Sequence, residues 1–369
     1  MYSENLAVEQ PKIDSIDLEL VKKFAFLIHF RFGYRSDMGQ FWKPLNKVSD
    51  NFYRKVFNKM KKQSFKWSEI YLNEEGIEND LLGITEMLMM SSEDMIKSGA
   101  KATSFKINSI IDDLVDRGYT NIGLGALTSP LTKGGLLLSE RKDVSITNGN
   151  AFTAVSMYNG MVKLIEKNNS LIEHQTIVGA TGSVGSCVAK MLVKHNYATN
   201  LQLIARNTEK LEELKKELNA ISPSVKIEIS ADMKDIKKSN LIVLLTASAD
   251  NLIKKEMLKK DAFILDGTQP RNTSEKLLIE RPDLTIVDGG IVNIPGITLK
   301  KGKLDLPENN YYACFSETLL LALEGYKEHF SVGNPTLDQA EYIHQLAKKH
   351  KKYGFHLADF TSFGNPIII

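Results

Sequence analysis

Cysteine is scarce in this chain, and its scarcity excludes several classes of protein. Only Cys187 and Cys314 occur among 369 residues. Two thiols cannot form a disulfide scaffold, and they cannot supply a zinc or iron–sulfur site held by several cysteines. We therefore predict no metal site, and each cysteine needs an explanation of its own.

Long apolar runs and an excess of charge of one sign are also missing. The most apolar stretches, residues 24–28 and 241–245, are far shorter than the roughly 20 residues of a membrane-spanning helix. The formal net charge of +2 gives no reason to expect whole-protein attraction to nucleic acid. The first residues lack the pattern of a signal peptide. We expect a soluble cytoplasmic protein, not transmembrane, with a disordered tail over residues 1–14.

The chain has ordinary globular composition, and its length predicts two or three domains at about 150 residues each. From about residue 171, short apolar strands alternate with helices, which is typical of a parallel sheet covered on both faces. The expected strands are 176–178, 201–205, 225–229, 241–245, 262–265 and 285–287, and the expected helices between them are 183–195 and 208–219. Helices are also predicted over 92–99, 104–118, 151–167, 309–330 and 336–351. The remaining periodicity before residue 165 is ambiguous.

These patterns predict an α/β fold with three parts. A doubly wound parallel-sheet (Rossmann) domain occupies residues 169–303. An α+β substrate domain surrounds it, built from residues 15–168 and from C-terminal helices over residues 304–369.

A glycine-rich loop follows the first strand of the predicted Rossmann domain. The sequence Gly179-Ala-Thr-Gly-Ser-Val-Gly185 has the spacing GxxGxxG rather than the common GxGxxG. Glycines make the tight turn, admit a pyrophosphate close to the backbone, and allow close packing of the next helix, whose N-terminus attracts the anion. The predicted dinucleotide-binding residues here are Gly179, Thr181, Gly182, Ser183, Val184 and Gly185. A glycine-rich turn without a ligand is the alternative.

The residues at the ends of the later strands indicate which dinucleotide is bound. Arg206 stands where an acidic residue would bind the ribose of NAD, and its guanidinium suits a 2′-phosphate, so NADPH is the predicted cofactor. A surface arginine at a strand end is the alternative. Asn207, Thr246, Ser248, Asp266 and Gly267 also follow strands and are further candidates for the cofactor site, or ordinary loop residues.

The two cysteines differ in their surroundings. Cys187 lies one turn into the helix after the glycine loop and is expected to pack on the sheet. Cys314 lies near the start of a predicted helix, where the pKa of a thiol can be lowered and the thiol becomes a better nucleophile. Glu317 shares its helix face and is a candidate for proton transfer or for helix capping. Spacing alone also leaves core packing open for Cys314.

Several segments together resemble a known family. Residues 179–186, Ala205-Arg-Asn, Leu265-Asp-Gly-Thr, Asp288-Gly-Gly and Tyr312-Ala-Cys-Phe-Ser-Glu-Thr-Leu-Leu-Leu-Ala-Leu-Glu-Gly occur in the order found in the long-chain acyl-[acyl-carrier-protein] reductases of cyanobacteria. Gly123-Leu-Gly-Ala-Leu-Thr-Ser and Thr147-Asn-Gly-Asn-Ala-Phe-Thr are similar to segments of that family too. The resemblance covers roughly residues 118–335. It implies reduction of a fatty acyl thioester to an aldehyde with NADPH, and it places the catalytic cysteine of the family on Cys314.

The chemistry that the resemblance implies needs further residues. An acyl-enzyme on Cys314 would be reduced to a thiohemiacetal, whose oxyanion requires hydrogen-bond donors. Thr128, Ser129, Asn148 and Asn150 are the candidates, with turn formation and capping as the alternative role. His29 is a candidate acid, although a single histidine in an apolar run is more often a core residue.

The expected partner is the fatty acyl thioester of an acyl carrier protein or of coenzyme A, together with a possible downstream enzyme that consumes the aldehyde. An acidic carrier protein needs a basic surface, for which Arg31, Arg35 and the cluster Lys348-Lys-His-Lys-Lys352 are candidates, or simply solvated charges. Two other functions stay open. One is an NADP-dependent dehydrogenase of an amino-acid or shikimate type, and the other is a dinucleotide-sensing regulator without turnover.

Overall fold

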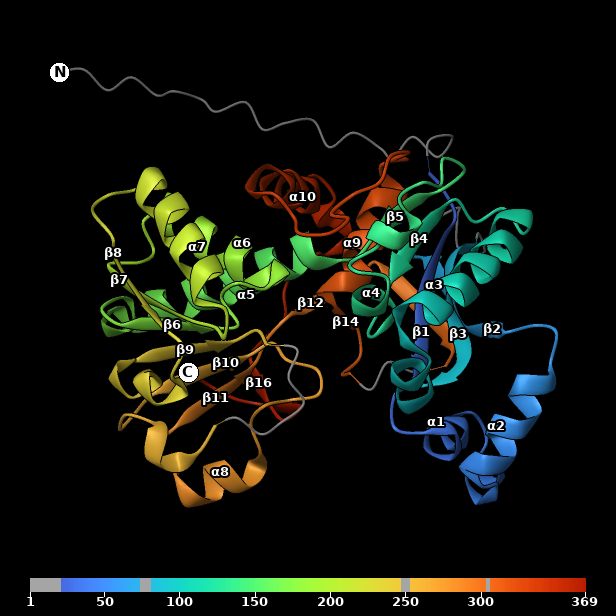
Figure 1. Cartoon of the computed structure of the whole chain (residues 1–369), viewed down its shortest axis with the longest axis horizontal. Helices are drawn as coiled ribbons and strands as arrows, with labels where there is room; N and C mark the ends of the chain where they lie inside the picture. Colours follow the sequence, from blue (N-terminus) through green and yellow to red (C-terminus); the bar gives the residue numbers. More distant parts are fainter. Residues whose placement is uncertain (1–20, 74–80, 247–252, 303–305) are drawn as a thin grey trace.

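The computed structural model describes residues 21–73, 81–246, 253–302 and 306–369. The predicted tail over residues 1–14 lies outside this part of the chain. The described residues form two six-stranded sheets, one in each half of the molecule, with helices between and around them (Figure 1).

The first sheet occupies the N-terminal half and has the strand order β13-β2-β3-β1-β4-β5. Four strands are parallel, while β2 and β13 run antiparallel to their neighbours. The strands of this mixed sheet are β1 (Phe24–Phe30), β2 (Ser64–Leu72), β3 (Leu81–Ser91), β4 (Asn121–Leu124), β5 (Ser145–Thr147) and β13 (Ile297–Lys301). Strands β1 and β3 are buried on both faces, so their sequences lack a clear alternation. This explains why periodicity before residue 165 was ambiguous.

The second sheet confirms the predicted Rossmann fold. All six strands are parallel, in the order β11-β10-β9-β6-β7-β8. Numbered from its first strand, this is the 3-2-1-4-5-6 order of dinucleotide-binding sheets. The strands are β6 (Gln175–Val178), β7 (Asn200–Ile204), β8 (Lys226–Ser230), β9 (Leu241–Leu244), β10 (Phe263–Asp266) and β11 (Thr285–Asp288).

The helices cover the sheets and connect the two halves. Figure 1 shows α6 and α7 on one face of the second sheet, α3 beside the first sheet, and α1 and α2 at the far end of the N-terminal half. Their bounds are α1 (Tyr34–Phe41), α2 (Asp50–Lys59), α3 (Ser92–Asp116), α4 (Thr128–Leu131), α5 (Asn150–Lys167), α6 (Ser183–Lys194), α7 (Thr208–Ile221), α8 (Glu275–Glu280), α9 (Ala313–Leu323) and α10 (Leu337–Lys349). The helices predicted over 92–99 and 104–118 are joined in α3, which is kinked at Gly99.

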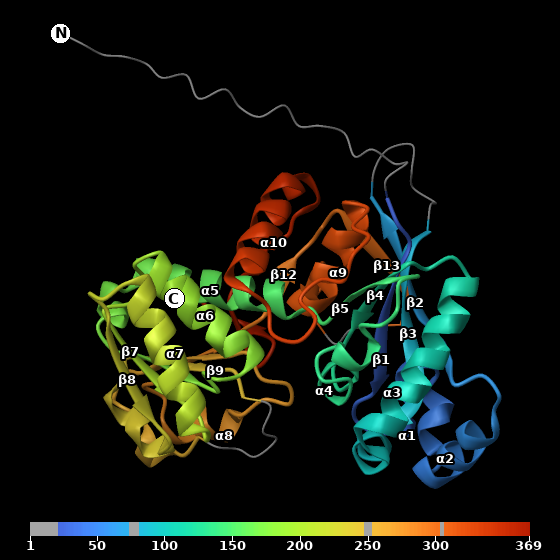
Figure 2. The same ribbon diagram turned by 45° about the horizontal axis from the view of Figure 1, so that its top comes forward.

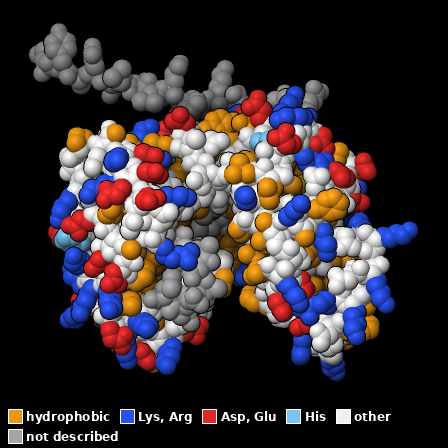
Figure 3. Space-filling model, in the orientation of Figure 1, with side chains coloured by type: hydrophobic (Ala, Val, Ile, Leu, Met, Phe, Trp, Pro, Cys, Tyr) orange, Lys and Arg blue, Asp and Glu red, His pale blue; other side chains and the backbone are white. Residues whose placement is uncertain are grey.

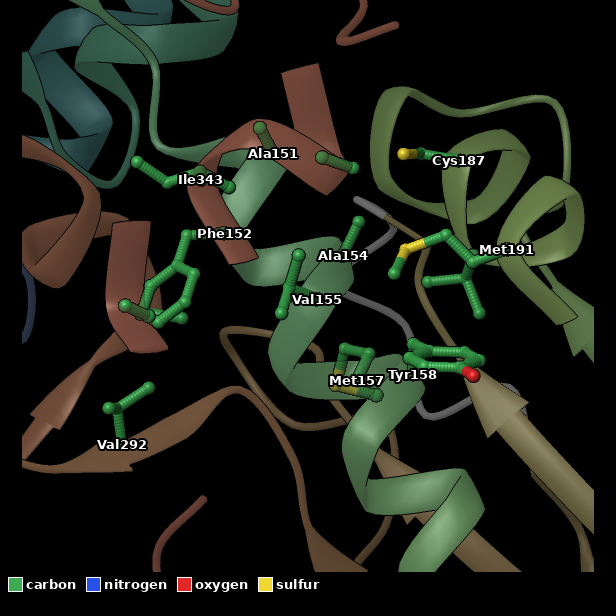
Figure 4. Close-up of a cluster of buried hydrophobic side chains, with 14 of the residues drawn as sticks. Ala151, Phe152, Ala154, Val155, Met157, Tyr158, Cys187, Met191, Val292 and Ile343 are labelled. Carbon is green, nitrogen blue, oxygen red and sulfur yellow. The ribbon is translucent and has the colours of Figure 1, made fainter. Parts of the chain in front are cut away.

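Helix α5 is the central element of the core. Eleven of its 18 residues are buried, and it packs against α6, α9 and α10. Figure 4 shows Phe152 directed toward Val292 on one side of α5, while Tyr158 approaches Met191 of α6 on the other. Cys187 is buried in the same cluster, as predicted for a packing residue. Because α5 is apolar on both sides, it joins the two halves through one continuous core.

The C-terminal segment returns to both halves. The strands β12 (Ile291–Asn293) and β14 (Asn310–Tyr312), which precede α9, form a small sheet with β15 (His356–Leu357), which follows α10. Helices α9 and α10 lie between the two large sheets (Figure 2). The hairpin β16 (Thr361–Ser362) and β17 (Asn365–Pro366) packs beside β11. The helix expected over 309–330 is shorter than predicted, because residues 310–312 pair with β12 and Gly325 adopts a left-handed conformation after α9.

One strand crosses the expected domain boundary. Residues 297–301, which we placed in the Rossmann domain, form β13 and pair antiparallel with β2 of the first sheet. Backbone pairing with an edge strand far away in sequence leaves no local pattern from which the boundary at residue 303 could be corrected.

Candidate functional site

Two adjoining cavities lie between the halves of the molecule. The first, of about 310 Å³, has Cys314 in its wall, and the second, of about 950 Å³, is lined by the glycine loop. Ser129, Pro130, Asn150 and Val184 line both. The space-filling view shows the hollow between the halves, with hydrophobic side chains along one wall (Figure 3). We call them the Cys314 cavity and the glycine-loop cavity.

Close backbone packing places Cys314 at the junction of these cavities. Cys314 is the second residue of α9 and is half-buried, whereas its neighbours Ala313 and Phe315 are buried. Gly149, just before α5, touches it so closely that a Cβ on Gly149 would lie 2.3 Å from the Cβ of Cys314. Thr318 lies on the same helix as Cys314, and a Cβ on Gly123 of β4 would lie 2.0 Å from Thr318 Oγ1. Two glycines thus allow α9 to sit directly on β4 and on the start of α5.

The pKa of Cys314 differs from the sequence expectation. Burial raises the pKa of the thiol to about 12, and the charge of Glu317 acts in the same direction. The backbone N–H groups at the start of α9 and the charge of Arg31 act the other way. The expectation of a lowered pKa at a helix N-terminus was wrong here, because the cost of desolvating a thiolate exceeds the favourable effect of the helix.

Glu317 is buried and connects α9 to the elements around Cys314. Its carboxylate accepts hydrogen bonds from Thr147 Oγ1, from Ser331 Oγ at 2.6 Å and from the backbone N–H of Phe152 at 2.6 Å. Burial raises the pKa of Glu317, and these hydrogen bonds oppose the rise. Of the two roles expected, the structure provides capping, but of α5 rather than of its own helix. The carboxylate therefore acts as a positioning group for α5 and α9.

Arg31 also lines the Cys314 cavity. Its guanidinium donates to Tyr312 Oη at 3.3 Å and to Gln269 Oε1 at 3.5 Å, and it lies over the rings of Phe32 and Tyr312. The residue follows β1, whereas Gln269 follows β10, so this contact joins the two halves beside the cavity. Arg31 was expected on an outer carrier-binding surface, and the structure places its charge near Cys314 instead.

The four candidate oxyanion donors separate into two pairs. Thr128 is buried and donates to Gly125 O, while both Nδ2 hydrogens of Asn148 reach carbonyl groups, of Gly134 and Gly333. These two side chains hold the backbone of the turns, which is the alternative role. Ser129 and Asn150 line both cavities, and Asn150 Nδ2 donates to Ser183 Oγ of α6 at 2.8 Å.

His29 is a satisfied core histidine. Its Nε2 accepts from the backbone N–H of Leu127 at 3.1 Å, which leaves Nδ1 to donate to Phe30 O at 3.0 Å. Burial lowers the pKa of His29 to about 4. With both ring nitrogens occupied and the neutral form favoured, His29 does not supply the acid that we considered.

The glycine loop has the geometry that a pyrophosphate needs. Gly179 has φ +84°, and a Cβ on Gly185 would lie 2.4 Å from Gly179 O, so neither position accepts a side chain. Within the described chain, no side chain caps the N-terminus of α6, so its first N–H groups are available to an anion. Gly179, Thr181, Gly182, Ser183 and Val184 line the glycine-loop cavity, whereas Gly185 lies behind it, in contact with Gly179. A dinucleotide fits these residues.

The ribose end of the same cavity is positively charged. Arg206 and Asn207 line it after β7, together with Lys210 of α7, and Lys133 lines the same cavity from the turn after α4. Arg206 is exposed, and the Asn207 side chain caps α7 by accepting from the N–H of Lys210 at 2.9 Å. Thr246 lines the cavity as well, and Ser248 lies outside the described residues. Lys210 and Lys133 are cations that sequence reasoning missed, because neither stands at a strand end.

Asp266 and Gly267 do not line the glycine-loop cavity. Asp266 is buried and accepts hydrogen bonds from Thr268, Asn272 and Thr273, which shape the loop after β10. Gly267 lines the Cys314 cavity, where a Cβ would lie 2.7 Å from Met157 Sδ. Asp266 therefore builds the loop that carries Gln269 toward Arg31.

Apolar side chains from successive strands line the Cys314 cavity. Phe26 and Ile28 come from β1, Met87 from β3 and Trp67 from β2. Trp67 stands at a break in the β2–β3 register, between Lys66 and Ser68. A bulge of this kind re-aims a side chain, and here the indole joins the cavity wall. Neighbouring strands lie about 4.8 Å apart, so the wall extends roughly 10 Å from β1 to β2 across the sheet. No sequence signal pointed to Trp67.

Comparisons with known proteins agree with the coenzyme half of this site. Residues 163–287 match the family model described as shikimate / quinate 5-dehydrogenase, a span that contains the second sheet and less than half of the chain. Among the solved structures, quinate dehydrogenase from Corynebacterium glutamicum in complex with NAD covers 88% of this chain and 100% of its own, at 13% identity and a TM-score of 0.39. That structural likeness is too distant to bear on function.

Two curated relatives extend beyond the second sheet. The chain is 26% identical over 293 residues to the aminotransferase PigE of Serratia sp., covering 77% of this chain and 33% of that protein. It is 26% identical over 266 residues to the long-chain acyl-[acyl-carrier-protein] reductase of Synechococcus elongatus, covering 68% of this chain and 76% of that protein. The chain therefore spans about a third of the first relative. Together with the glycine loop, the matches support an oxidoreductase of the NAD(P)-dependent dehydrogenase type.

Proposed function

We propose that this protein reduces a long-chain fatty acyl thioester to the aldehyde with NADPH, through an acyl-enzyme on Cys314. One observation carries the proposal. The thiol faces an apolar cavity that shares Ser129, Pro130, Asn150 and Val184 with the glycine-loop cavity. A nucleophile, an apolar chain and a dinucleotide can therefore meet at one place.

The coenzyme choice follows from the charge at the ribose end. Arg206 and Lys210 line the cavity beside β7, and none of the cavity-lining residues described there is acidic. Arginine suits the geometry of a phosphate, and an acidic residue is what the ribose of NAD would require. The bound coenzyme would supply the hydride.

The residues of the chain would perform the remaining chemistry. Cys314 Sγ loses its proton and attacks the thioester carbonyl, and the bond to the donor sulfur breaks as that sulfur leaves and takes up a proton. After hydride transfer, the oxygen of the thiohemiacetal carries a negative charge. Ser129 and Asn150 would donate hydrogen bonds to it, and their position in the lining of both cavities supports this role. Collapse breaks the bond to Cys314 Sγ and releases the aldehyde.

A shikimate-type dehydrogenase is the second candidate, and the family match over residues 163–287 favours it. That span covers the coenzyme-binding half. The sheet wall of the Cys314 cavity, formed by Phe26, Ile28, Trp67 and Met87, is apolar and suits an acyl chain, whereas a polyol or a carboxylate would have to bind the polar residues that also line the cavity, Arg31 among them. A ketone reduction would also leave Cys314 without a role.

The test combines turnover with trapping of the intermediate. Protein, NADPH and a long-chain acyl thioester of coenzyme A or of a carrier protein are mixed, and NADPH oxidation and aldehyde are followed together. Without NADPH, a radiolabelled acyl group should remain bound to the protein after denaturation. We expect Cys314→Ala to abolish both the label and the aldehyde.

Cys187→Ala is the matched control, because Cys187 is the other thiol and lies buried in the core. It should retain label and turnover. Aldehyde formation at the wild-type rate by Cys314→Ala would refute the acyl-enzyme. Reduction of NADP+ by shikimate, or oxidation of NADPH by an amino-acid-derived ketone or imine, without turnover of any acyl thioester, would favour the second candidate. Coenzyme binding without turnover on any of these would point to a regulator.

A further inference from the structure

Residues 31–62 form a strongly basic surface in a chain that is nearly neutral overall. They contain nine Lys or Arg and two Asp, a net charge of +7, although the whole chain carries only +2. Two of these cations are paired, Arg54 with Glu93 and Asp94, and Lys62 with Asp113. Most of the others are exposed lysines, and Figure 3 shows blue side chains projecting from this part of the molecule, at the lower right.

The same segment exposes large apolar side chains. Its exposed members are Phe32, Phe41, Trp42, Phe52, Val56 and Met60, with Trp42 64% and Phe52 58% exposed. We call this set, with the lysines around it, the basic aromatic surface. Single exposed apolar residues are ordinary, whereas exposed apolar residues that gather on one part of a surface mark interaction sites, and six of them occur in this one segment.

Helix α2 shows how the two kinds of side chain are arranged. Tyr53 and Phe57 point into the core, where they pack with Tyr34 and Phe30. Phe52 and Val56, four residues apart, form an exposed stripe, and Lys55 and Lys59 lie beside it. An apolar stripe flanked by lysines is typical of helices that lie in a membrane interface, where the lysine stems reach back to the phosphates.

The basic aromatic surface is continuous with the Cys314 cavity. Phe32 lines that cavity, and Phe41 contacts Trp67 of the cavity wall with ring centroids 4.9 Å apart. The basic aromatic surface therefore begins at residues that also form or touch the wall of the cavity.

We infer that the basic aromatic surface binds the face of an anionic bilayer, with Trp42 and Phe52 entering the interface and the lysines contacting lipid phosphates. The apolar groups favour a bilayer over an acidic protein, because they are distributed over a loop and a helix stripe rather than around one pocket. Membrane binding stands without the proposed function. Only its purpose, exchange of a long-chain aldehyde with lipid, rests on that function.

Vesicle sedimentation tests the inference without turnover, so its failure and that of the proposed function are distinguishable. Full-length protein is mixed with vesicles of phosphatidylcholine alone, or of equal parts phosphatidylcholine and phosphatidylglycerol. We expect binding to the anionic vesicles that weakens as salt is raised. Trp42→Ser or Phe52→Ser should each weaken it roughly tenfold. The pair Lys55→Gln and Lys59→Gln should weaken it roughly 30-fold at low salt.

Matched controls separate this surface from charge or apolarity in general. Phe105→Ser removes an exposed aromatic side chain of α3. The pair Lys348→Gln and Lys351→Gln removes exposed charge at the other basic cluster. Both should bind vesicles as the wild type does. Absence of wild-type binding, or equal loss in these controls, would overturn the inference. The inference would also be overturned if Trp42→Ser weakened the binding of an acidic carrier protein but left vesicle binding unchanged.

Discussion

The absence of a side chain on Gly149 allows Cys314 to pack directly against it, and Gly149→Ala tests how much this contact contributes to stability. A Cβ at this position would lie 2.3 Å from the Cβ of Cys314 and 2.4 Å from its Cα. Neither atom can rotate away, and α9 cannot easily retreat, because Thr318 contacts Gly123 and Glu317 is hydrogen-bonded to three groups. The substitution must therefore displace the start of α9 or of α5.

The expected cost has two parts. Gly149 has φ +76°, and an alanine in a left-handed conformation costs about 1–2 kcal/mol. Overpacking a close contact adds about 1–3 kcal/mol. Gly118→Ala is the matched control, since Gly118 has φ +85° but nothing described lies within 4 Å of its Cβ position. Gly118→Ala should lose only the stability that the left-handed conformation costs.

Thermal unfolding of the two variants in parallel isolates the contact. For a chain of 369 residues, each kcal/mol lowers the melting temperature by about 1.3 °C, so Gly149→Ala should melt about 1–4 °C below Gly118→Ala. The rate at which iodoacetamide modifies Cys314 in the native protein should change in Gly149→Ala only. Equal melting temperatures together with unchanged alkylation would refute the reasoning that Gly149 and Cys314 are in contact.

Three further predictions address the coenzyme, the thiol and the apolar wall. In calorimetry, Arg206→Ala should weaken NADPH binding roughly tenfold or more, the value of one charge-assisted hydrogen bond, and leave NADH binding unchanged. Equal weakening of both would show that Arg206 does not bind the 2′-phosphate. Burial raises the pKa of Cys314 to about 12, so its thiolate fraction and its alkylation rate should rise about tenfold per pH unit from pH 7 to 10 without a plateau. Arg31→Gln should slow the alkylation further. A plateau of the rate near pH 8 would contradict the raised pKa. Trp67→Leu should shift kcat/KM among acyl thioesters toward longer chains, by roughly fourfold per added methylene that gains contact, and an unchanged chain-length profile in an active variant would show that Trp67 does not limit the cavity.

Within the part of the chain that the structure describes, no helix is both long and apolar enough to cross a bilayer. The basic aromatic surface instead consists of exposed apolar and basic side chains in a short segment, and a hydropathy average over a long window does not detect it.

The sequence by itself determined the Rossmann half. Short apolar strands, the spacing of Gly179, Gly182 and Gly185, and the position of Arg206 are local patterns, and each follows from a few neighbouring residues. Parallel strands that are buried on both faces appear as apolar runs, so their positions could be predicted closely. The same locality explains why Cys187 was placed in the core.

Only the tertiary structure decided the substrate half and the state of the site. Strand β1 pairs with β3 and β4 across long separations in the sequence, and β13 joins β2 from beyond the second sheet. The pKa of Cys314 depends on its burial and on Glu317. Arg31 contacts Tyr312 and also Gln269, in the loop after β10, and Trp67 stands at a bulge. Such effects depend on which surfaces meet in space, and the pattern of neighbouring residues does not contain that information.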